Sequence, residues 1–355
     1  MIKVIYLGSH NESYNPKRGP SFEYNNFYLT LKNIRDVEVI EHPFDRILEA
    51  GKARFNEELL DLVKKEKPDL VFVFTFSDEL DKKTLLRVKE MTKTLGWYAD
   101  DSWRFYNYSR TWFPYFTWNV TTYSWIPALA KRLGFQNVIR SQWAANPLAS
   151  HPVEIKRDIE VSFVGQRNPE RASVVDSLRR AGINVFVRGW GWPEGKASQE
   201  EMLQIISRSK ITLNINSQRS PWNIESLGRL LARRSINRFV PDFHVFRNFE
   251  SWRRIGVPQI KARPFELAAC RTFVISGFAD DLDDFYKEGE EMVFYRSTED
   301  LIKKIKEYLP QDDLRERIAE AGYTRTLRDH TYEKRFRQIF SQVGLKKFDA
   351  ARHED

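Results

Sequence analysis

Apolar and polar residues alternate along the chain in a way that predicts repeated strand–helix units. Short apolar runs at Ile2–Leu7 and Asp69–Phe76 have the length of buried strands, and the segments between such runs carry apolar residues at helical spacing. The alternation resumes at Ile159–Val164 and continues through Ile211–Ile215 to Phe273–Ser276. Strands that alternate with helices favour parallel sheets with helices on both faces, so we predict an α/β fold.

The pattern is interrupted by AANPLASHPVEIKR, at residues 144–157, where two prolines and the loss of periodicity indicate a linker. The 355 residues exceed one typical domain, and we expect two. The predicted first domain is residues 1–148, and the second is residues 149–328. Helices are expected at Thr298–Leu309, Asp312–Gly322 and Thr331–Val343, the last within a closing segment at residues 329–355.

A long insertion at residues 217–257 precedes the last strand of the second domain, to which we assign it. It contains eight arginines but three acidic residues, and aromatic residues are interleaved with them. Loops this long without a role are uncommon. It is suited to an anionic acceptor, a phospholipid surface or a nucleic acid, and equally to a solvated face or an oligomer contact.

The net charge and the cysteine content limit the possible binding partners and the cellular compartment of the protein. The formal net charge is +8, which suits an anionic ligand or surface without identifying it. One cysteine, Cys270, excludes an intramolecular disulfide and fits a reducing compartment. No apolar run has the roughly 20 residues that cross a bilayer. We therefore expect a cytoplasmic protein, with peripheral contact at the inner membrane surface as one role of the basic residues.

Two loops follow strands of the first domain, at Ser9–Ser21 and Asp100–Trp112. Ligands of parallel sheets bind beyond the carboxyl ends of the strands. The first loop lacks G-x-G-x-x-G, which argues against a simple dehydrogenase. The second loop contains two carboxylates, an aromatic ring and a cation, which are Asp100, Asp101, Trp103 and Arg104. This combination suits sugar binding, because aromatic rings stack on the apolar faces of sugars and carboxylates accept hydrogen bonds from their hydroxyls. The alternative is that Asp100 or Asp101 only caps the next helix.

The second domain has two clusters at predicted strand ends. In FVGQRNPER, Gly165 ends a strand, and Arg167 and Arg171 flank the next helix start. Arginine supplies forked donors to phosphate oxygens, although solvated surface arginines are the plainer interpretation. In PQIKARPFELAACRTFVISG, a helix starts beside Lys261, Arg263 and Glu266. Such a start suits a phosphorylated, hydroxyl-rich ligand, but Glu266 in its first turn is also ordinary helix-start chemistry.

Five blocks occur in an order that resembles the CgeB-like, spore-maturation type glycosyltransferases. They are FVGQRNPER, the RGWGW turn, KITLNI, QIKARPFELAACRTFVISG and HTYEKRF, over roughly residues 160–340. The resemblance implies a GT-B fold, in which two Rossmann-like domains face each other across a cleft and the last helix crosses back to the first domain. It also implies a nucleotide-sugar donor bound mostly by the second domain and an acceptor bound mostly by the first.

The resemblance also assigns residues to roles. Glu266 corresponds to the acidic residue that accepts the ribose hydroxyls, and Lys261, Arg263, Arg167 and Arg171 correspond to the diphosphate group. The remaining donor-side residues are Gly165, Asn214, Phe265, Ser276 and Gly277. On the acceptor side are His10, Trp103 and Arg104, and the catalytic candidates are Asp100, Asp101 and Glu266. The chain departs from many retaining GT-B enzymes at Pro258, where they have a sugar-facing glutamate, and from its relatives at Arg271, where glycine is common.

These residues predict a metal-independent sugar transfer with no cofactor beyond the nucleotide-sugar co-substrate. The resemblance to relatives of the large retaining GT-B group implies retention of configuration. Cations and a helix dipole near the leaving diphosphate would stabilise its developing charge. The acceptor is open among a glycan, a lipid-linked molecule and a protein. The alternatives are a DNA-modifying glycosyltransferase with a nucleic-acid acceptor and a non-catalytic, bilobed nucleotide-binding or scaffold protein, which the missing glutamate permits.

Overall fold

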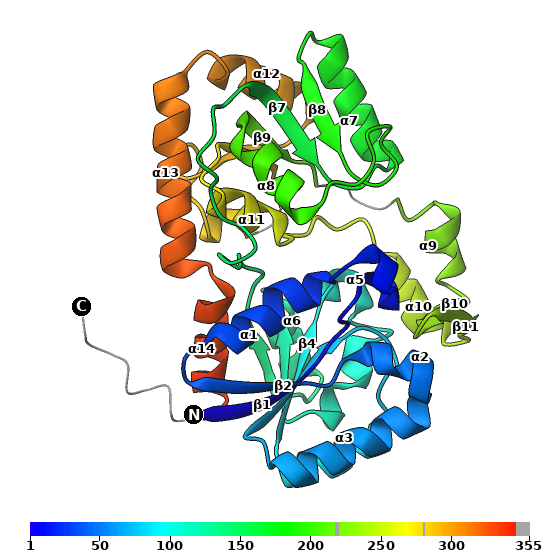
Figure 1. Cartoon of the computed structure of the whole chain (residues 1–355). Coiled ribbons are helices and arrows are strands. Elements are labelled where there is room, and N and C mark those ends of the chain that lie inside the picture. Colours follow the sequence, from blue (N-terminus) through cyan, green and yellow to red (C-terminus); the bar gives the residue numbers. More distant parts are fainter. Residues whose placement is uncertain (217–219, 280, 346–355) are drawn as a thin grey trace. The chain divides into compact units, whose positions relative to one another are not determined.

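The computed structural model describes residues 1–216, 220–279 and 281–345, and these form two compact units (Figure 1). Unit 1 comprises residues 1–142, 220–257 and 332–345 of the described chain, and unit 2 comprises residues 143–216, 258–279 and 281–331. Residues 217–219 of the predicted insertion and 346–355 of the predicted closing segment lie outside the described residues.

Unit 1 is built on a six-stranded parallel sheet with the order β2-β1-β3-β4-β5-β6. Every residue of the central strand β3 is buried, as expected for a strand covered on both faces. The strands are β1 (Ile2–Leu7), β2 (Val37–Glu41), β3 (Leu70–Thr75), β4 (Lys93–Tyr98), β5 (Trp118–Thr121) and β6 (Val138–Arg140).

Helices connect these strands, and the last helix of the chain also packs in unit 1. Phe336 of α14 is fully buried, with its ring 5.4 Å from Phe27 and 5.6 Å from Phe72. The closing helix therefore returns to the first sheet, as expected. The α-helices are α1 (Leu29–Asn33), α2 (Ile47–Ala50), α3 (Lys52–Glu66), α4 (Lys82–Met91), α5 (Asp101–Arg104), α6 (Ile126–Arg132) and α14 (Tyr332–Gln342), and a π-helix, Tyr24–Tyr28, precedes α1.

The insertion packs in unit 1, whereas its position in the sequence had assigned it to the second domain. Its described part forms α9 (Ile224–Gly228), the antiparallel hairpin β10 (Ala232–Ser235) and β11 (Arg238–Pro241), and α10 (Val245–Trp252). Arg233 forms an ion pair of 3.0 Å with Asp78, and the Ile236 amide donates to Ser77 Oγ at 2.8 Å. These contacts tie the hairpin to the loop after β3, which chain order alone does not reveal.

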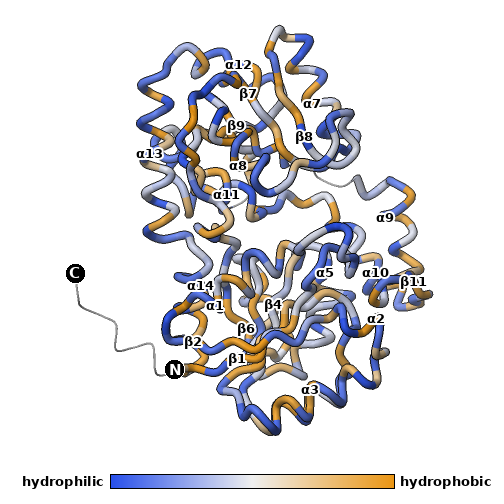
Figure 2. The backbone as a smooth tube through the Cα atoms, in the orientation of Figure 1, coloured by the Kyte–Doolittle hydropathy of each residue, from blue (hydrophilic) through white to orange (hydrophobic). Residues whose placement is uncertain are grey.

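Unit 2 contains a five-stranded parallel sheet with the order β13-β12-β9-β7-β8. Two parallel α/β sheets confirm the predicted fold class. In Figure 2 the central strands of both units are coloured mainly as hydrophobic, whereas α13 is mainly hydrophilic. The strands are β7 (Ile159–Val164), β8 (Val185–Arg188), β9 (Ser209–Asn214), β12 (Val274–Gly277) and β13 (Val293–Tyr295).

The helices of unit 2 begin at side-chain caps where the sequence provides them. Asn168 accepts from the Arg171 amide at the start of α7, and Ser198 and Glu201 form a reciprocal capping box at the start of α8. Ser297 caps α12 in the same way as Asn168 caps α7. The helices are α7 (Pro169–Arg180), α8 (Gln199–Ser207), α11 (Arg263–Ala269), α12 (Thr298–Tyr308) and α13 (Asp312–Asp329).

Two backbone positions differ from sequence expectations in informative ways. Helix α13 continues to Asp329, past Gly322, where the sequence predicted its end. A Cβ atom at Gly322 would lie 2.3 Å from the Glu291 carbonyl oxygen, so this glycine lets α13 approach the backbone before β13 closely and does not end the helix. Arg271 has a φ of +54°, a conformation that favours glycine, which fits the glycine common at this position in the CgeB-like group.

Within the described residues, no helix has both the length and the apolar composition that crossing a bilayer requires.

Candidate functional site

The carboxyl ends of three neighbouring strands in unit 2 bring predicted donor residues together. Asn214 ends β9, and its Nδ2 donates to the Oγ of Ser276 on β12 at 2.9 Å. Asn216 follows β9, and its Nδ2 donates to the Gly277 carbonyl oxygen at 2.8 Å. Gly165 follows β7 on the other side of β9. In parallel α/β sheets this edge is where ligands bind.

The RGWGW turn, residues 188–192, packs on the loop that follows β7. Trp192 Nε1 donates to the Gly165 carbonyl oxygen at 3.0 Å, and the Arg167 amide donates to the Trp190 carbonyl oxygen at 2.8 Å. Gly189 has a φ of +141°, and a Cβ there would lie 2.2 Å from the Gly165 carbonyl oxygen. Only glycine allows this approach, which holds the two loops together at the strand ends.

Two of the predicted diphosphate arginines lie at this edge. Arg171 is half-buried: its Nε donates to the Ile215 carbonyl oxygen at 3.2 Å, and its Nη1 donates to the Gln166 carbonyl oxygen at 2.9 Å. Burial, and then the nearby charge of Arg263, lower the pKa of Arg171. Arg167 is exposed and lies 5.7 Å from the Trp192 ring centre. Arg171 is therefore fixed by backbone carbonyls, whereas Arg167 faces solvent.

Helix α11 carries the remaining predicted donor residues. Glu266 is paired with Arg263 at 3.1 Å, and 12% of its side chain is exposed. No side chain caps the start of this helix, so Glu266 does not have the helix-capping role weighed from the sequence. Lys261 is exposed and hydrogen bonds to Gln259. Phe265 is fully buried; its ring packs against Phe285, Tyr286 and His330, which gives it a core position.

Three side chains that sequence reasoning did not single out also contribute to this edge. Asn216 follows the KITLNI block as an ordinary polar loop residue, and Trp192 lies within the RGWGW turn. Tyr295 ends β13, and burial raises the pKa of its hydroxyl while the Arg171 charge opposes the rise. A Cβ at Gly277 would lie 3.2 Å from both the Tyr295 hydroxyl and the Asn216 Cβ, so Gly277 leaves room for these side chains.

In unit 1 the two adjacent aspartates occupy different environments. Asp101 is fully buried and accepts a hydrogen bond from Ser109, and burial raises the pKa of its carboxyl to about 7. Asp100 is half-buried with a φ of +59°, and its carbonyl oxygen accepts from the amides of Trp103 and Arg104. Its side chain does not cap α5. Only Asp100 of the pair is in a position to meet a ligand.

Asp100, Trp103 and Arg104 line a cavity of about 780 Å³ within unit 1. Trp103 is half-buried, with the Arg229 guanidinium 4.8 Å from its ring centre. Arg104 donates to the Phe76 carbonyl oxygen at 2.6 Å. The insertion supplies one wall, through Arg229, Ala232, Arg233, Arg234, Asp242, His244 and Arg247. The structure thus joins the predicted acceptor loop to the arginine-rich insertion in one cavity.

His10, the remaining acceptor-side candidate, lies elsewhere in unit 1. Its Nδ1 lies 3.0 Å from Glu41 Oε1, and its ring centre is 4.1 Å from that of Tyr24. His10 is not among the residues that line the 780 Å³ cavity.

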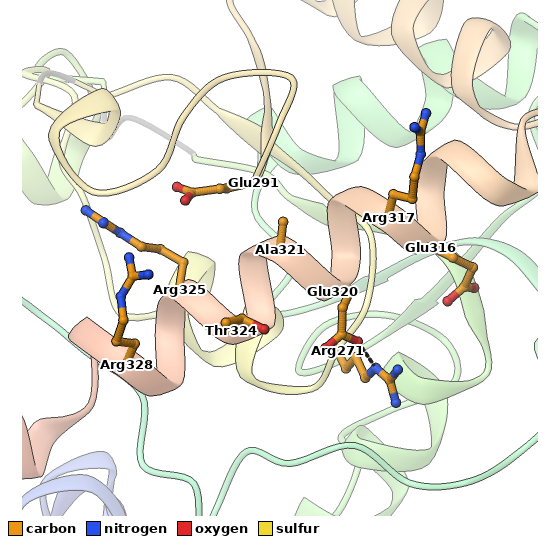
Figure 3. A pocket seen from close by; sticks show the side chains of 9 residues that line it. All are labelled: Arg271, Glu291, Glu316, Arg317, Glu320, Ala321, Thr324, Arg325 and Arg328. Carbon is orange, nitrogen blue, oxygen red and sulfur yellow. Dashed lines mark hydrogen bonds and ion pairs between the residues drawn. The ribbon is translucent and has the colours of Figure 1, made fainter. Parts of the chain in front are cut away.

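A second hollow, of about 640 Å³, runs along α13 in unit 2 (Figure 3). Arg271 and Glu291 precede β12 and β13, so the hollow lies toward the amino ends of these strands, away from the predicted donor residues. Several of its charges are paired: Arg271 with Glu320, and Arg325 with Asp329 at 3.1 Å. None of the predicted donor residues lines this hollow.

Comparison with known proteins places these sites in an enzyme class. Residues 167–341, just under half of the chain, match the family described as Glycosyl transferase-like. This segment includes the RGWGW turn, the ends of β9 and β12, and all of α11. A comparison with curated protein sequences finds no significant match.

Solved structures resemble the chain over nearly its whole length. A glycosyltransferase from Rickettsia africae has a TM-score of 0.60 at 10% identity, covering 98% of this chain and 99% of that one. HepE of Anabaena, solved with UDP and glucose, has a TM-score of 0.59 at 9% identity, covering 97% and 100%. Sucrose-phosphate synthase of Thermosynechococcus elongatus has a TM-score of 0.59 at 11% identity, covering 96% and 100%.

At these identities the structural likeness establishes the fold, which is GT-B. The family match over residues 167–341, which includes parts of both units, identifies the chain as a glycosyltransferase enzyme.

Proposed function

We propose that the enzyme transfers a sugar from a nucleotide-sugar donor held at the carboxyl edge of the unit 2 sheet. The main support is the set of groups gathered there: Arg171 fixed by two carbonyl oxygens, and Glu266 paired with Arg263 but still partly exposed. HepE, which shares the fold, was solved with UDP and with UDP-glucose. UDP is therefore the first nucleotide to test.

The residues then divide between the two parts of the donor. Glu266 accepts hydrogen bonds from the ribose hydroxyls. The diphosphate is contacted by four cations, which are Arg263, Arg171, Arg167 and Lys261. Arginine suits this role because its planar fork matches phosphate oxygens and remains charged. The five ordered blocks are the basis for placing the enzyme in the CgeB-like group.

The same cations support the bond-breaking step. The bond between the anomeric carbon and the diphosphate oxygen breaks, and the acceptor oxygen bonds to that carbon on the same face. The acceptor proton passes to the leaving phosphate, so no protein nucleophile is required. Fixed cations stabilise the charge that develops on the diphosphate. Within the described residues, no group of three or more His, Cys, Asp or Glu side chains is placed to hold a metal, and a metal-independent reaction is part of this proposal.

A panel of nucleoside diphosphates, followed by thermal unfolding, tests the donor proposal and identifies the base. A ligand at about 100 times its Kd stabilises the folded state by about 2.7 kcal/mol, enough for a clear rise in Tm. We expect UDP to raise the Tm of the wild type and to do so less for Arg263→Ala. If no nucleoside diphosphate raises the Tm, the proposed nucleotide-sugar donor site is wrong, and a scaffold role is favoured.

The acceptor in this proposal binds unit 1, in the cavity lined by Asp100, Trp103 and Arg104. The Trp103 ring suits the apolar face of a sugar, and the Asp100 carboxylate suits its hydroxyls. Asp101, being fully buried, supports the loop without meeting the acceptor.

Peripheral membrane contact is a further part of the proposal, supported by the described part of the insertion. Half of the exposed large apolar side chains in the described chain lie between residues 222 and 249. Phe246 is 90% exposed and Phe243 79% exposed, and arginines lie among them. Exposed aromatic residues with basic neighbours are suited to an anionic lipid surface.

Flotation with vesicles tests this contact. We expect wild-type protein to float with phosphatidylglycerol-containing vesicles, and Phe246→Glu to float less. Leu86→Glu, which changes an exposed apolar residue of α4 outside the insertion, is the matched control. Equal flotation of all three proteins, or none, would exclude the contact.

A further inference from the structure

Three cations from separate segments of unit 1 meet at a second, smaller cavity. Lys82 begins α4, Arg110 lies in the 3₁₀ turn Ser109–Thr111, and Arg247 lies on α10 of the insertion. With Thr111, Leu133 and Phe135 they line a cavity of about 410 Å³. Lys82, Thr111 and Arg247 also line the 780 Å³ cavity, so the two cavities adjoin. We call Lys82, Arg110 and Arg247 the cation cluster.

The three cations of the cluster have no carboxylate partner among the described residues. Lys82 Nζ lies 4.9 Å from the Tyr115 ring centre and 5.5 Å from that of Trp112. The Arg110 guanidinium lies 5.5 Å from the Tyr106 ring centre. These rings position the cations without neutralising them.

Neighbouring cations of the larger cavity do pair with carboxylates. Lys52 pairs with Asp81 at 3.0 Å, and Arg233 pairs with Asp78 at 3.0 Å. Arg229 pairs with Glu225 at 2.7 Å. Arg104 and Arg234 also line the larger cavity, but they donate to the carbonyl oxygens of Phe76 and Ile236 and not to carboxylates. The cation cluster is therefore distinguished by three cations that line one small cavity without a carboxylate.

Like charges held together cost free energy that a bound anion would recover. Burial, and then the Arg247 charge, lower the pKa values of both Lys82 and Arg110. The Arg247 charge thus acts on both of the other cations. Because Arg247 comes from the insertion and the other two from the first domain, the packing of the insertion creates this concentration of charge.

The number of charges and the apolar residues that line the small cavity indicate the chemistry of the ligand. Three cations match a phosphate group, which offers three oxygens and up to two negative charges, better than they match a carboxylate. Leu133 and Phe135 give the small cavity an apolar side, which suits the carbon chain of a phosphate ester. The adjoining larger cavity contains Trp103 and Asp100, which suit a hydroxyl-bearing group.

We propose that the cation cluster binds a phosphate group of the acceptor, the molecule that receives the sugar. The hydroxyl-bearing part of this acceptor occupies the larger cavity. The role as acceptor rests on the glycosyltransferase function proposed above, whereas phosphate-ester binding by the cluster does not. The phosphate belongs either to a soluble phosphorylated acceptor or to a lipid headgroup, and the two sources require different probes.

Calorimetric titration with sn-glycerol 3-phosphate tests the soluble source. All proteins in this titration carry Arg263→Ala, which reduces phosphate binding at the proposed donor site of unit 2. We expect binding that Lys82→Ala or Arg247→Ala each weakens about tenfold, as for loss of one charged hydrogen-bond partner. Arg238→Ala removes an exposed arginine of the same insertion that lines neither cavity, and we expect no change. Lys82→Arg keeps the charge and should retain binding.

Phosphatidylcholine vesicles with and without phosphatidylglycerol test the lipid source on the same variants. Binding only to the anionic vesicles, lost in Lys82→Ala and Arg247→Ala but kept in Arg238→Ala, supports the cluster and assigns the phosphate to a lipid. If the protein binds neither probe, the proposal is overturned. It is also overturned if Arg238→Ala loses as much binding as Lys82→Ala and Arg247→Ala do. UDP binding, measured on Lys82→Ala and Arg247→Ala proteins that keep Arg263, tests the donor function separately, so failure of either proposal can be distinguished.

Discussion

Replacing Asp101 by asparagine removes a carboxyl group that unit 1 buries completely. Burial raises the pKa of this carboxyl from its ordinary value of 3.8 to about 7, against the opposing effect of the hydrogen bond from Ser109. The folded protein therefore holds the Asp101 proton more tightly than the unfolded chain does. The stability that this proton contributes is fully present below pH 3.8 and is lost as the pH rises to about 7.

The magnitude follows from the difference between the two pKa values. At 1.36 kcal/mol for each pKa unit, the cost of ionising the buried carboxyl reaches roughly 4 kcal/mol above pH 7. Asparagine has nearly the shape of the protonated acid and cannot ionise. We expect Asp101→Asn to equal the wild type near pH 4 and to be more stable than it at about pH 8, by up to that amount.

Urea unfolding at several pH values, followed by circular dichroism, measures this difference. Burial also raises the pKa of Glu23 to about 7, so the wild type alone would not isolate Asp101, whereas the difference between the two proteins does. If that difference does not change between pH 4 and pH 8, Asp101 ionises as readily in the folded protein as in the unfolded chain. The assignment of a buried, supporting carboxyl would then be wrong.

Three further predictions test other parts of the structure. Gly189→Ala places a Cβ 2.2 Å from the Gly165 carbonyl oxygen at a φ of +141°, and should lower the free energy of unfolding by about 2–4 kcal/mol and weaken nucleotide binding. Gly195→Ala is the control and should cost less stability, because no atom lies within 4 Å of the added Cβ. Thermal unfolding and nucleotide titration would measure both effects. Trp192→Phe removes the indole hydrogen bond to Gly165 and should lower the free energy of unfolding by about 1 kcal/mol in denaturant titration. Phe336→Ala empties a buried aromatic site between α14 and the first sheet and should cost about 3–5 kcal/mol, and a loss below about 1 kcal/mol would contradict the packing of this helix.

The sequence was sufficient to predict the parallel α/β architecture because strands buried on both faces appear as short apolar runs. The run at β3 has no exposed residue in the structure. The packing of the insertion was not predictable, because its arginines and aromatic residues lack a period that relates them to either sheet. Its tertiary contacts, among them those of Arg233 with Asp78 and of Ile236 with Ser77, show where it belongs.

The donor cluster was predictable in part, for physical reasons that differ between residues. Arg171 follows a strand end in the sequence, where ligands of parallel sheets bind. Glu266 stands in the first turn of a helix, beside two cations. Phe265 stands in the same stretch, but its side chain points into the core, and one sequence gives no sign of that direction. Asp100 and Asp101 are chemically identical neighbours, and only tertiary packing distinguishes the buried carboxylate from the accessible one.

Turnover of the nucleotide sugar whose nucleotide the panel identifies is the most direct test of the donor site. Release of nucleoside diphosphate would be measured for the wild type, for Glu266→Ala and for Glu307→Ala, which removes an exposed glutamate from α12. The loss of a charged hydrogen-bond partner predicts a fall of at least about tenfold for Glu266→Ala, with Glu307→Ala unchanged. Wild-type turnover in a correctly folded Glu266→Ala protein would contradict the assignment of the donor site to the carboxyl edge of unit 2.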